Sequence, residues 1–89
     1  MLSNDPVTEM LAKRIAGEIV LSLNPGSTMR KWRSLLKINQ VETAHELELS
    51  PSVISDYETG RRRSPGSAFI RRFVGAILDI DERRGGHYV

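Results

Sequence analysis

The chain has 89 residues, no cysteine and a net charge of +2, so it can form one small domain but offers no disulfide framework and no thiolate metal site. No apolar run approaches the roughly 20 residues of a membrane-spanning helix, and Asp5 and Glu9 interrupt the N-terminus before the apolar core of a signal peptide could form. We therefore expect a single-domain cytoplasmic protein with no membrane partner.

The first predicted helix is amphipathic and begins at Asp5-Pro6, an N-cap followed by proline at the first helical position. The segment Asn24-Pro25-Gly26-Ser27 ends it. Its apolar positions recur every four residues with others beside them: Val7, Leu11, Ile15 and Ile19, then Met10, Val20 and Leu23. This stripe has to be covered. Two alternatives remain open: it packs on the domain's own core, or residues 1–26 form an arm that packs on a second chain.

The next helix is predicted from about Thr28 to Lys37. Its inward face carries Met29, Trp32, Leu35 and Leu36. The other face carries Arg30, Lys31, Arg33 and Lys37. These charges are consistent either with a solvated helix surface or with contacts to a DNA backbone.

Residues 39 to 60 predict two short helices joined by a tight turn. Asn39 and Glu42 have the spacing of a capping box at the start of the first helix. Gln40 lies in that first turn, where helix N-termini hold phosphate. The inward positions of the pair, which form the predicted core of the motif, are Ala44, Leu47, Leu49, Ile54 and Tyr57.

The second short helix is predicted to start with Ser50 as N-cap and Pro51 at its first position, and to end at Gly60. Its polar side chains then point away from the core: Ser52, Ser55, Asp56 and Thr59. Glu48 occupies the turn between the two helices. A left-handed turn there costs a residue with a side chain on the order of 1–2 kcal/mol.

Three arginines follow the second short helix directly: Arg61, Arg62 and Arg63. No acidic residue interrupts the chain from there to Arg72, and a local basic patch indicates nucleic-acid binding better than net charge does. The alternative is a solvated basic loop. Ser67 is then predicted to cap a last helix, whose apolar face has the helical period: Phe69, Ile70, Phe73, Val74, Ile77 and Leu78.

The set formed by Asn39-Gln40, Ala44, Ser50 to Ser55 and Tyr57-Glu58-Thr59-Gly60 resembles the lambda-repressor/Cro-like (Xre-type) helix-turn-helix family. SPSVISDYETGRRRSPG followed by FIRRFV is similar to archaeal regulators of this class, and the resemblance covers residues 28 to 80. It implies an all-α fold of about five helices, with an extra N-terminal amphipathic helix. The implied DNA-binding domain spans residues 27–82, followed by a flexible tail at 83–89. Glu48 departs from the glycine that the family usually has in the turn.

The resemblance also implies roles for individual residues. The base-reading residues would be Pro51, Ser52, Val53 and Asp56. The residues on phosphate would be Gln40, Ser55, Arg61, Arg62, Arg63, Lys31 and Arg33. Arg33 would also pair with Glu58 and tie the first helix of the DNA-binding unit to the third; the alternative is two unpaired surface charges.

Enzyme chemistry finds little support in this sequence. His45 and His87 are isolated, Asp56 and Glu58 point to different faces of one helix, and we expect no metal or cofactor. We expect a homodimeric transcriptional regulator that binds double-stranded DNA sequence-specifically through residues 51–59. The alternative is a protein-binding adaptor of the same fold, such as a coactivator that contacts the basal transcription machinery or an antitoxin.

Overall fold

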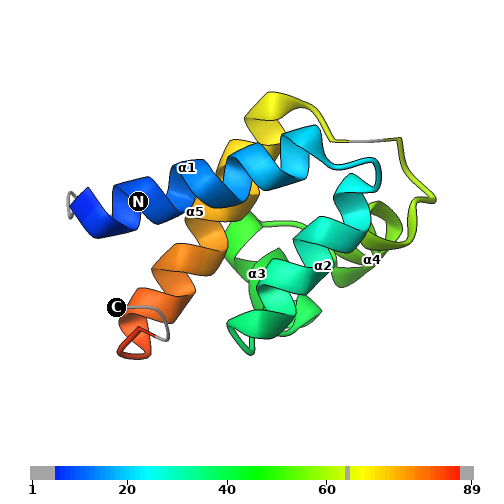
Figure 1. Cartoon of the computed structure of the whole chain (residues 1–89). Helices are drawn as coiled ribbons and strands as arrows, with labels where there is room; N and C mark the ends of the chain where they lie inside the picture. Colours follow the sequence, from blue (N-terminus) through cyan, green and yellow to red (C-terminus); the bar gives the residue numbers. More distant parts are fainter. Residues whose placement is uncertain (1–5, 64, 87–89) are drawn as a thin grey trace.

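The computed structural model describes residues 6–63 and 65–86 and contains five α-helices (Figure 1). They are α1 (Pro6–Leu21), α2 (Pro25–Leu35), α3 (Gln40–Leu47), α4 (Pro51–Thr59) and α5 (Ser67–Arg83). The described residues form no strand, so the predicted all-α class with about five helices is confirmed. Asp5, the predicted cap of α1, lies outside the described residues.

Local signals set the starts of α3 and α4. Asn39 Oδ1 accepts from the Glu42 backbone N–H at 2.8 Å, and Glu42 Oε1 accepts from the Asn39 N–H at 3.0 Å, so the predicted capping box is present. Ser50 and Pro51 take the predicted N-cap and first helical positions of α4. The Ser50 side chain makes no capping hydrogen bond, however, and its Oγ lies 3.0 Å from Ser52 Oγ instead.

Helix α2 begins earlier than predicted, at Pro25 rather than near Thr28. Its first turn runs against the end of α4: a Cβ added at Gly26 would lie 2.1 Å from the carbonyl oxygen of Tyr57 and 3.0 Å from that of Glu58. Only glycine fits this approach. The segment that the sequence marks as a break is therefore also the contact that places α2 on α4.

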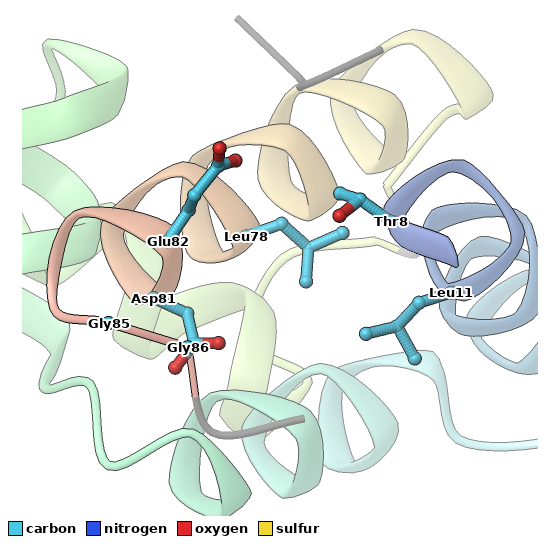
Figure 2. A pocket seen from close by; sticks show the side chains of 7 residues that line it. All are labelled: Thr8, Leu11, Leu78, Asp81, Glu82, Gly85 and Gly86. Carbon is cyan, nitrogen blue, oxygen red and sulfur yellow. The ribbon is translucent and has the colours of Figure 1, made fainter. Parts of the chain in front are cut away.

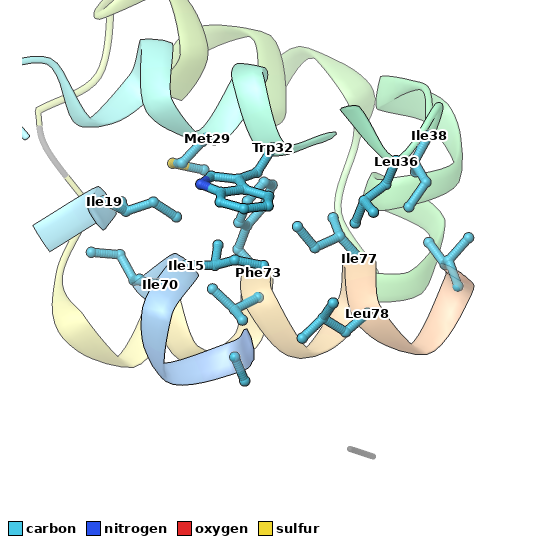
Figure 3. Close-up of a cluster of buried hydrophobic side chains, with 13 residues drawn as sticks. Ile15, Ile19, Met29, Trp32, Leu36, Ile38, Ile70, Phe73, Ile77 and Leu78 are labelled. Carbon is cyan, nitrogen blue, oxygen red and sulfur yellow. The ribbon is translucent and has the colours of Figure 1, made fainter. Parts of the chain in front are cut away.

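The main core lies between α1, α2 and α5 (Figure 3). Ile15 and Ile19 of α1 are fully buried in it, so α1 packs on the domain's own core. The buried members from the other two helices and from the α2–α3 connection are Met29, Trp32, Leu36, Ile38, Ile70, Phe73, Val74, Ile77, Leu78 and Ile80. The prediction that Leu35 points inward is wrong: its side chain is exposed.

A second, smaller core joins the two short helices to α5. Its buried members are Ala44, Leu47, Ile54 and Ala76, with Leu49 and Phe69 partly buried against them. Tyr57, predicted to belong to the same set, is partly buried and packs instead against the main core. The predicted core of the motif is thus shared between two clusters.

The ends of α5 differ from the prediction. Gly66 is the N-cap and Ser67 is the first helical residue, so the prediction that Ser67 caps the helix is wrong. The helix continues to Arg83, and the backbone N–H of Gly86 donates to the carbonyl of Asp81 at 2.8 Å. Residues 83–86, predicted as the start of a tail, are therefore part of the ordered domain.

This C-terminal turn is held against α3. Arg83 Nη2 donates to Glu46 Oε1 at 2.6 Å, which lowers the pKa of Glu46 below its ordinary value and raises that of Arg83. Arg84 forms an ion pair with Glu42 and donates through Nη1 to the carbonyl oxygen of Lys37 at 2.9 Å. The end of α5 thus fixes the N-terminal half of the motif from the side away from α4.

Candidate nucleic-acid interface

The turn between α3 and α4 is the tight left-handed turn that the sequence predicts. Glu48 has φ 57° and ψ 42°, and its side chain is exposed. The backbone N–H groups of Glu48 and Leu49 donate to the carbonyl oxygens of His45 and Ala44, at 3.2 and 2.8 Å. These bonds satisfy the last carbonyls of α3 and set the angle at which α4 leaves.

The N-terminal half of α4 presents an open polar surface. Pro51 and Ser52 are exposed, and Val53, Ser55 and Asp56 are partly exposed, while Ile54 on the opposite side is fully buried. Asp56 forms no ion pair with any residue that the structure describes. The residues that the resemblance assigns to base reading are therefore all at least partly accessible in the first two turns of α4.

Behind this face, α4 is anchored to α2 by a buried two-bond ion pair. Arg33 Nε donates to Glu58 Oε2 at 2.7 Å, and Arg33 Nη2 donates to Glu58 Oε1 at 2.8 Å. Arg33 Nη1 donates to the carbonyl of Ile38 at 2.7 Å, and Gln40 Nε2 donates to Glu58 Oε1 at 3.1 Å. The network links the first turn of α3, the end of α2 and the last turn of α4.

Arg33 and Glu58 are only 9% and 6% exposed. The structure therefore contains the Arg33–Glu58 pair that the resemblance implies. Arg33 has little capacity left to bind a phosphate, because Nε and Nη2 donate to Glu58 and Nη1 donates to the carbonyl of Ile38. Arg33 therefore has a structural role, and the prediction that it also contacts phosphate is wrong.

Lys31 lies in a different environment from Arg33. Its Nζ donates to Glu18 Oε1 at 3.1 Å and lies 5.4 Å from the centre of the Trp32 ring. Trp32 Nε1 donates to the same oxygen at 3.2 Å, and Arg14 donates to the other oxygen of Glu18. Since residues two apart on a helix do not share a face, Lys31 secures α2 to α1 while Arg33 secures it to α4.

The sequence does not reveal the role of Glu18. Its spacing from Arg14 is readable as an i, i+4 pair. Its contacts with α2 depend on how the two helices cross. The hydrogen bond from Lys31, followed by that from Trp32, lowers the pKa of Glu18 below its ordinary value despite partial desolvation.

The arginine loop leaves α4 beside its open face. Arg61, Arg62 and Arg63 are all exposed. The backbone N–H of Arg62 donates to the carbonyl of Asp56 at 3.1 Å, and its guanidinium lies 5.6 Å from the centre of the Tyr57 ring. Three exposed cations therefore follow the last turn of α4, and none of them forms an ion pair with a residue that the structure describes.

Comparison with known proteins agrees with this geometry. A sequence model described as helix-turn-helix matches residues 29–76, which extend from α2 into α5. The chain belongs to the helix-turn-helix family, of the lambda-repressor type. No solved structure matches the chain significantly.

Two archaeal relatives of this helix-turn-helix chain are similar over most of its length. One, an uncharacterised HTH-type transcriptional regulator of Archaeoglobus fulgidus, is 53% identical over 75 residues, which cover 84% of this chain and 32% of the relative. The other, an uncharacterised HTH-type transcriptional regulator of Methanocaldococcus jannaschii, is 48% identical over 81 residues, 91% of this chain and 34% of the relative. The chain spans about a third of the length of these relatives. The predicted similarity to archaeal regulators is confirmed.

One concave surface of the helix-turn-helix chain is lined by residues outside α4. A pocket of about 190 Å³ opens between α1 and the end of α5 (Figure 2). Its lining residues are Thr8, Leu11, Leu78, Asp81, Glu82, Gly85 and Gly86. Across residues 6–63 and 65–86, no three acidic or histidine side chains gather as a metal site would require, and no helix is long and apolar enough to cross a bilayer.

Proposed function

We propose that this chain is the DNA-binding domain of a sequence-specific, cytoplasmic transcriptional regulator that inserts the N-terminal half of α4 into the major groove. The observation that carries this proposal is the accessible start of α4, at Pro51, Ser52 and Val53, on a helix that the buried Arg33–Glu58 pair anchors and that the exposed arginine loop follows. A major groove admits a helix, and a helix that reads bases must keep a fixed angle to the protein that presents it.

Base recognition by this α4 has to rely on small side chains. Arg, Asn and Gln, which bind base edges through two hydrogen bonds, do not occur between residues 51 and 59. Val53 offers methyl groups to a thymine methyl, Asp56 accepts from a cytosine amino group, and Ser52 donates or accepts with little selectivity. Sequence choice would therefore depend also on DNA shape and half-site spacing.

Phosphate contacts would supply most of the affinity. The arginine loop carries three cations, and Ser55 and Gln40, which are both partly exposed, would add neutral donors. Gln40 lies at the N-terminus of α3, where the helix dipole attracts an anion, and its side chain is held by Glu58. Each neutralised phosphate releases counterions, so binding should weaken steeply as salt is added.

A selection experiment tests base reading. Random duplexes would be selected with the wild-type chain, with Val53→Ala and with Asp56→Ala, and the enriched sequences compared. We expect each substitution to change the preferred base at one or two positions more than it changes total affinity for random duplex. A uniform loss across all sequences would show that neither side chain reads a base, and Val41→Ala, on exposed α3 surface, is the matched control.

We also propose that two copies associate through the outer face of α1. Ile15 and Ile19 occupy the inner face, yet Met10 is 71% exposed and Leu21 is 85% exposed on the outer one. Gly17 lies between them with open space around it, although glycine weakens a helix interior by about 0.5–1 kcal/mol. A helix from a second copy would cover both side chains and explain the glycine.

The charges on α1 favour an antiparallel pairing. A register that places Met10 opposite Leu21 of the second copy also places Arg14 opposite Gly17 and close to Glu18 of that copy. Because α1 and α4 pack on different sides of the molecule (Figure 1), this pairing leaves both recognition helices free. Successive major grooves would require them to lie about 34 Å apart.

Sedimentation analysis over a range of concentrations tests the pairing. We expect Leu21→Glu to shift the chain to monomer, because it buries a charge at the predicted contact, while Val41→Glu on α3 leaves association unchanged. A wild-type chain that stays monomeric at all concentrations overturns the proposed pairing.

Binding to a general transcription factor without any duplex affinity would favour the alternative function, a protein-binding adaptor of the same fold.

A further inference from the structure

Two aromatic rings and one guanidinium lie in series at the C-terminal end of α4. The rings of Tyr57 and Phe69 are stacked with their centres 4.4 Å apart and their planes 29° apart. Phe69 comes from α5 and is partly buried against both cores, so it fixes the inner side of the stack. The guanidinium of Arg62 lies 5.6 Å from the centre of the Tyr57 ring.

The backbone holds Arg62 in the same place. Gly60 takes the left-handed conformation with φ 83°, and the Arg62 N–H then donates to the carbonyl of Asp56 at 3.1 Å. The chain therefore turns back over the last turn of α4. Arg61 and Arg63 make no side-chain hydrogen bond, ion pair or ring contact with any residue described in the structure.

A guanidinium that lies over an aromatic ring keeps more of its hydrogen-bond donors available than one paired with a carboxylate. The donors of Arg33 point into the carboxylate of Glu58 and are used up. A guanidinium over a ring face keeps its N–H donors in its own plane, available to a second partner. The ring contact and the hydrogen bond to Asp56 restrict Arg62, while its side-chain donors have no carboxylate partner among the described residues; this combination lowers the entropy cost of binding an oxyanion.

We propose that the Tyr57–Phe69 stack holds Arg62 ready for a backbone phosphate of bound duplex, so that Arg62 contributes more to binding than Arg61 or Arg63. Tyr57 is then a positioning residue for DNA binding as well as a packing residue. This inference rests on the proposed function for its ligand, while the ordering of Arg62 stands on the free protein alone.

The ordering is tested without DNA by nuclear magnetic resonance. The Hδ protons of Arg62 should be shifted upfield by the ring current of Tyr57, and those of Arg61 and Arg63 should not. The shift should persist in Tyr57→Phe and disappear in Tyr57→Leu, which keeps an apolar side chain without a ring. Equal chemical shifts for the three arginines in the wild-type chain would overturn the ordering.

The contribution to binding is tested with three matched surface variants, Arg61→Ala, Arg62→Ala and Arg63→Ala, on one duplex at one salt concentration. We expect Arg62→Ala to lose about 2- to 5-fold more affinity than either neighbour, the range of an exposed cation–π contact. Tyr57→Leu should lose a similar factor in the wild-type background and none in the Arg62→Ala background. Tyr57→Phe should bind as the wild type does.

The outcomes separate the inference from the proposed function. Equal losses for the three alanine variants, or an additive effect of Tyr57→Leu and Arg62→Ala, would overturn the positioning role while duplex binding itself stands. No duplex binding by the wild-type chain would overturn the proposed function and the phosphate role together, with the ring-current result still deciding the ordering. If Tyr57→Leu fails to fold, the alanine series and Tyr57→Phe decide.

Discussion

At the scale of single residues, Arg33 and Arg62 differ in burial and in the partners of their guanidinium groups. Arg33 is buried and donates to Glu58 and to the carbonyl oxygen of Ile38, whereas Arg62 is exposed with its guanidinium over the Tyr57 ring. A buried ion pair that loses one partner leaves an uncompensated charge, which costs far more than an exposed pair contributes. The first arginine therefore belongs to the fold, and the second is available to a ligand.

Glu58→Gln should lower the free energy of unfolding by about 3 kcal/mol, because the Arg33 charge stays buried without its counter-charge. Urea unfolding followed by circular dichroism measures this, with Glu48→Gln as an exposed control that should change little. A loss equal to that of the control would show that the pair contributes nothing to stability.

Two glycines in helices should respond oppositely to alanine. Gly26→Ala should destabilise the fold by about 1–3 kcal/mol, since its Cβ meets the Tyr57 carbonyl oxygen and α2 has to move from α4. Gly17→Ala, with nothing near its Cβ, should stabilise α1 by about 0.5–1 kcal/mol in dilute solution. Thermal unfolding compares the two, and similar melting temperatures would contradict the close approach at Gly26.

Sequence and structure agree at the residue scale wherever local spacing or the family pattern is decisive. The Asn39 capping box follows from spacing alone, and the Arg33–Glu58 pair follows from resemblance. From the sequence, Gly26 is interpreted only as a helix breaker. The reason that the position needs glycine is its contact with the backbone of α4, which lies more than thirty residues further along the chain. Contacts that depend on how two helices cross leave no mark in a single sequence.

At the scale of the elements, the α3–α4 turn carries a measurable strain. Glu48 is in the left-handed region with φ 57°, where its Cβ is close to a carbonyl oxygen. Glu48→Gly should therefore raise the free energy of unfolding by up to about 1 kcal/mol, reduced by the greater flexibility of the unfolded chain. Urea unfolding checks this, and a destabilised variant would show that the Glu48 side chain contributes more than the strain costs.

Helix α1 shows why the predicted inward stripe is only half right. Positions spaced by four residues drift about 40° around a helix at each step, so over the whole row the direction turns by about 120° and one end of the row leaves the core. Ile15 and Ile19 are fully buried, whereas Val7 is 54% exposed and Thr8 and Ala12 take the inner positions nearer the start. The sequence pattern therefore predicts that α1 exists and roughly where it begins and ends. Which side of α1 faces inward depends on its packing against α2 and α5.

At the scale of the whole molecule, stability should fall in acid. Hydrogen bonds from Lys31 and Arg83 hold the pKa values of Glu18 and Glu46 below the ordinary value of 4.5. The folded state therefore binds these protons less readily than the unfolded state, and the stabilisation is full above 4.5 and is lost as pH falls through the folded-state values.

Urea unfolding at about pH 6 and about pH 3 measures this dependence. The urea concentration at the unfolding midpoint should be lower at the acidic pH than at the neutral one. The decrease should be smaller for Glu46→Gln, because a glutamine at this position does not titrate. Added salt should weaken the effect, because both groups lie at the surface. An equal drop in Glu46→Gln would contradict the contribution of the Arg83 contact.

For the molecule as a whole, we propose that the five-helix domain presents α4 and the arginine loop to duplex DNA. The direct measurement is the affinity of the wild-type chain for duplex DNA over a series of salt concentrations. With the three loop arginines each neutralising one phosphate, log affinity should fall against log salt with a slope of about −3 for one bound copy and about −5 for two copies bound together. Affinity that does not change with salt, or no duplex binding at the lowest salt, would contradict the account.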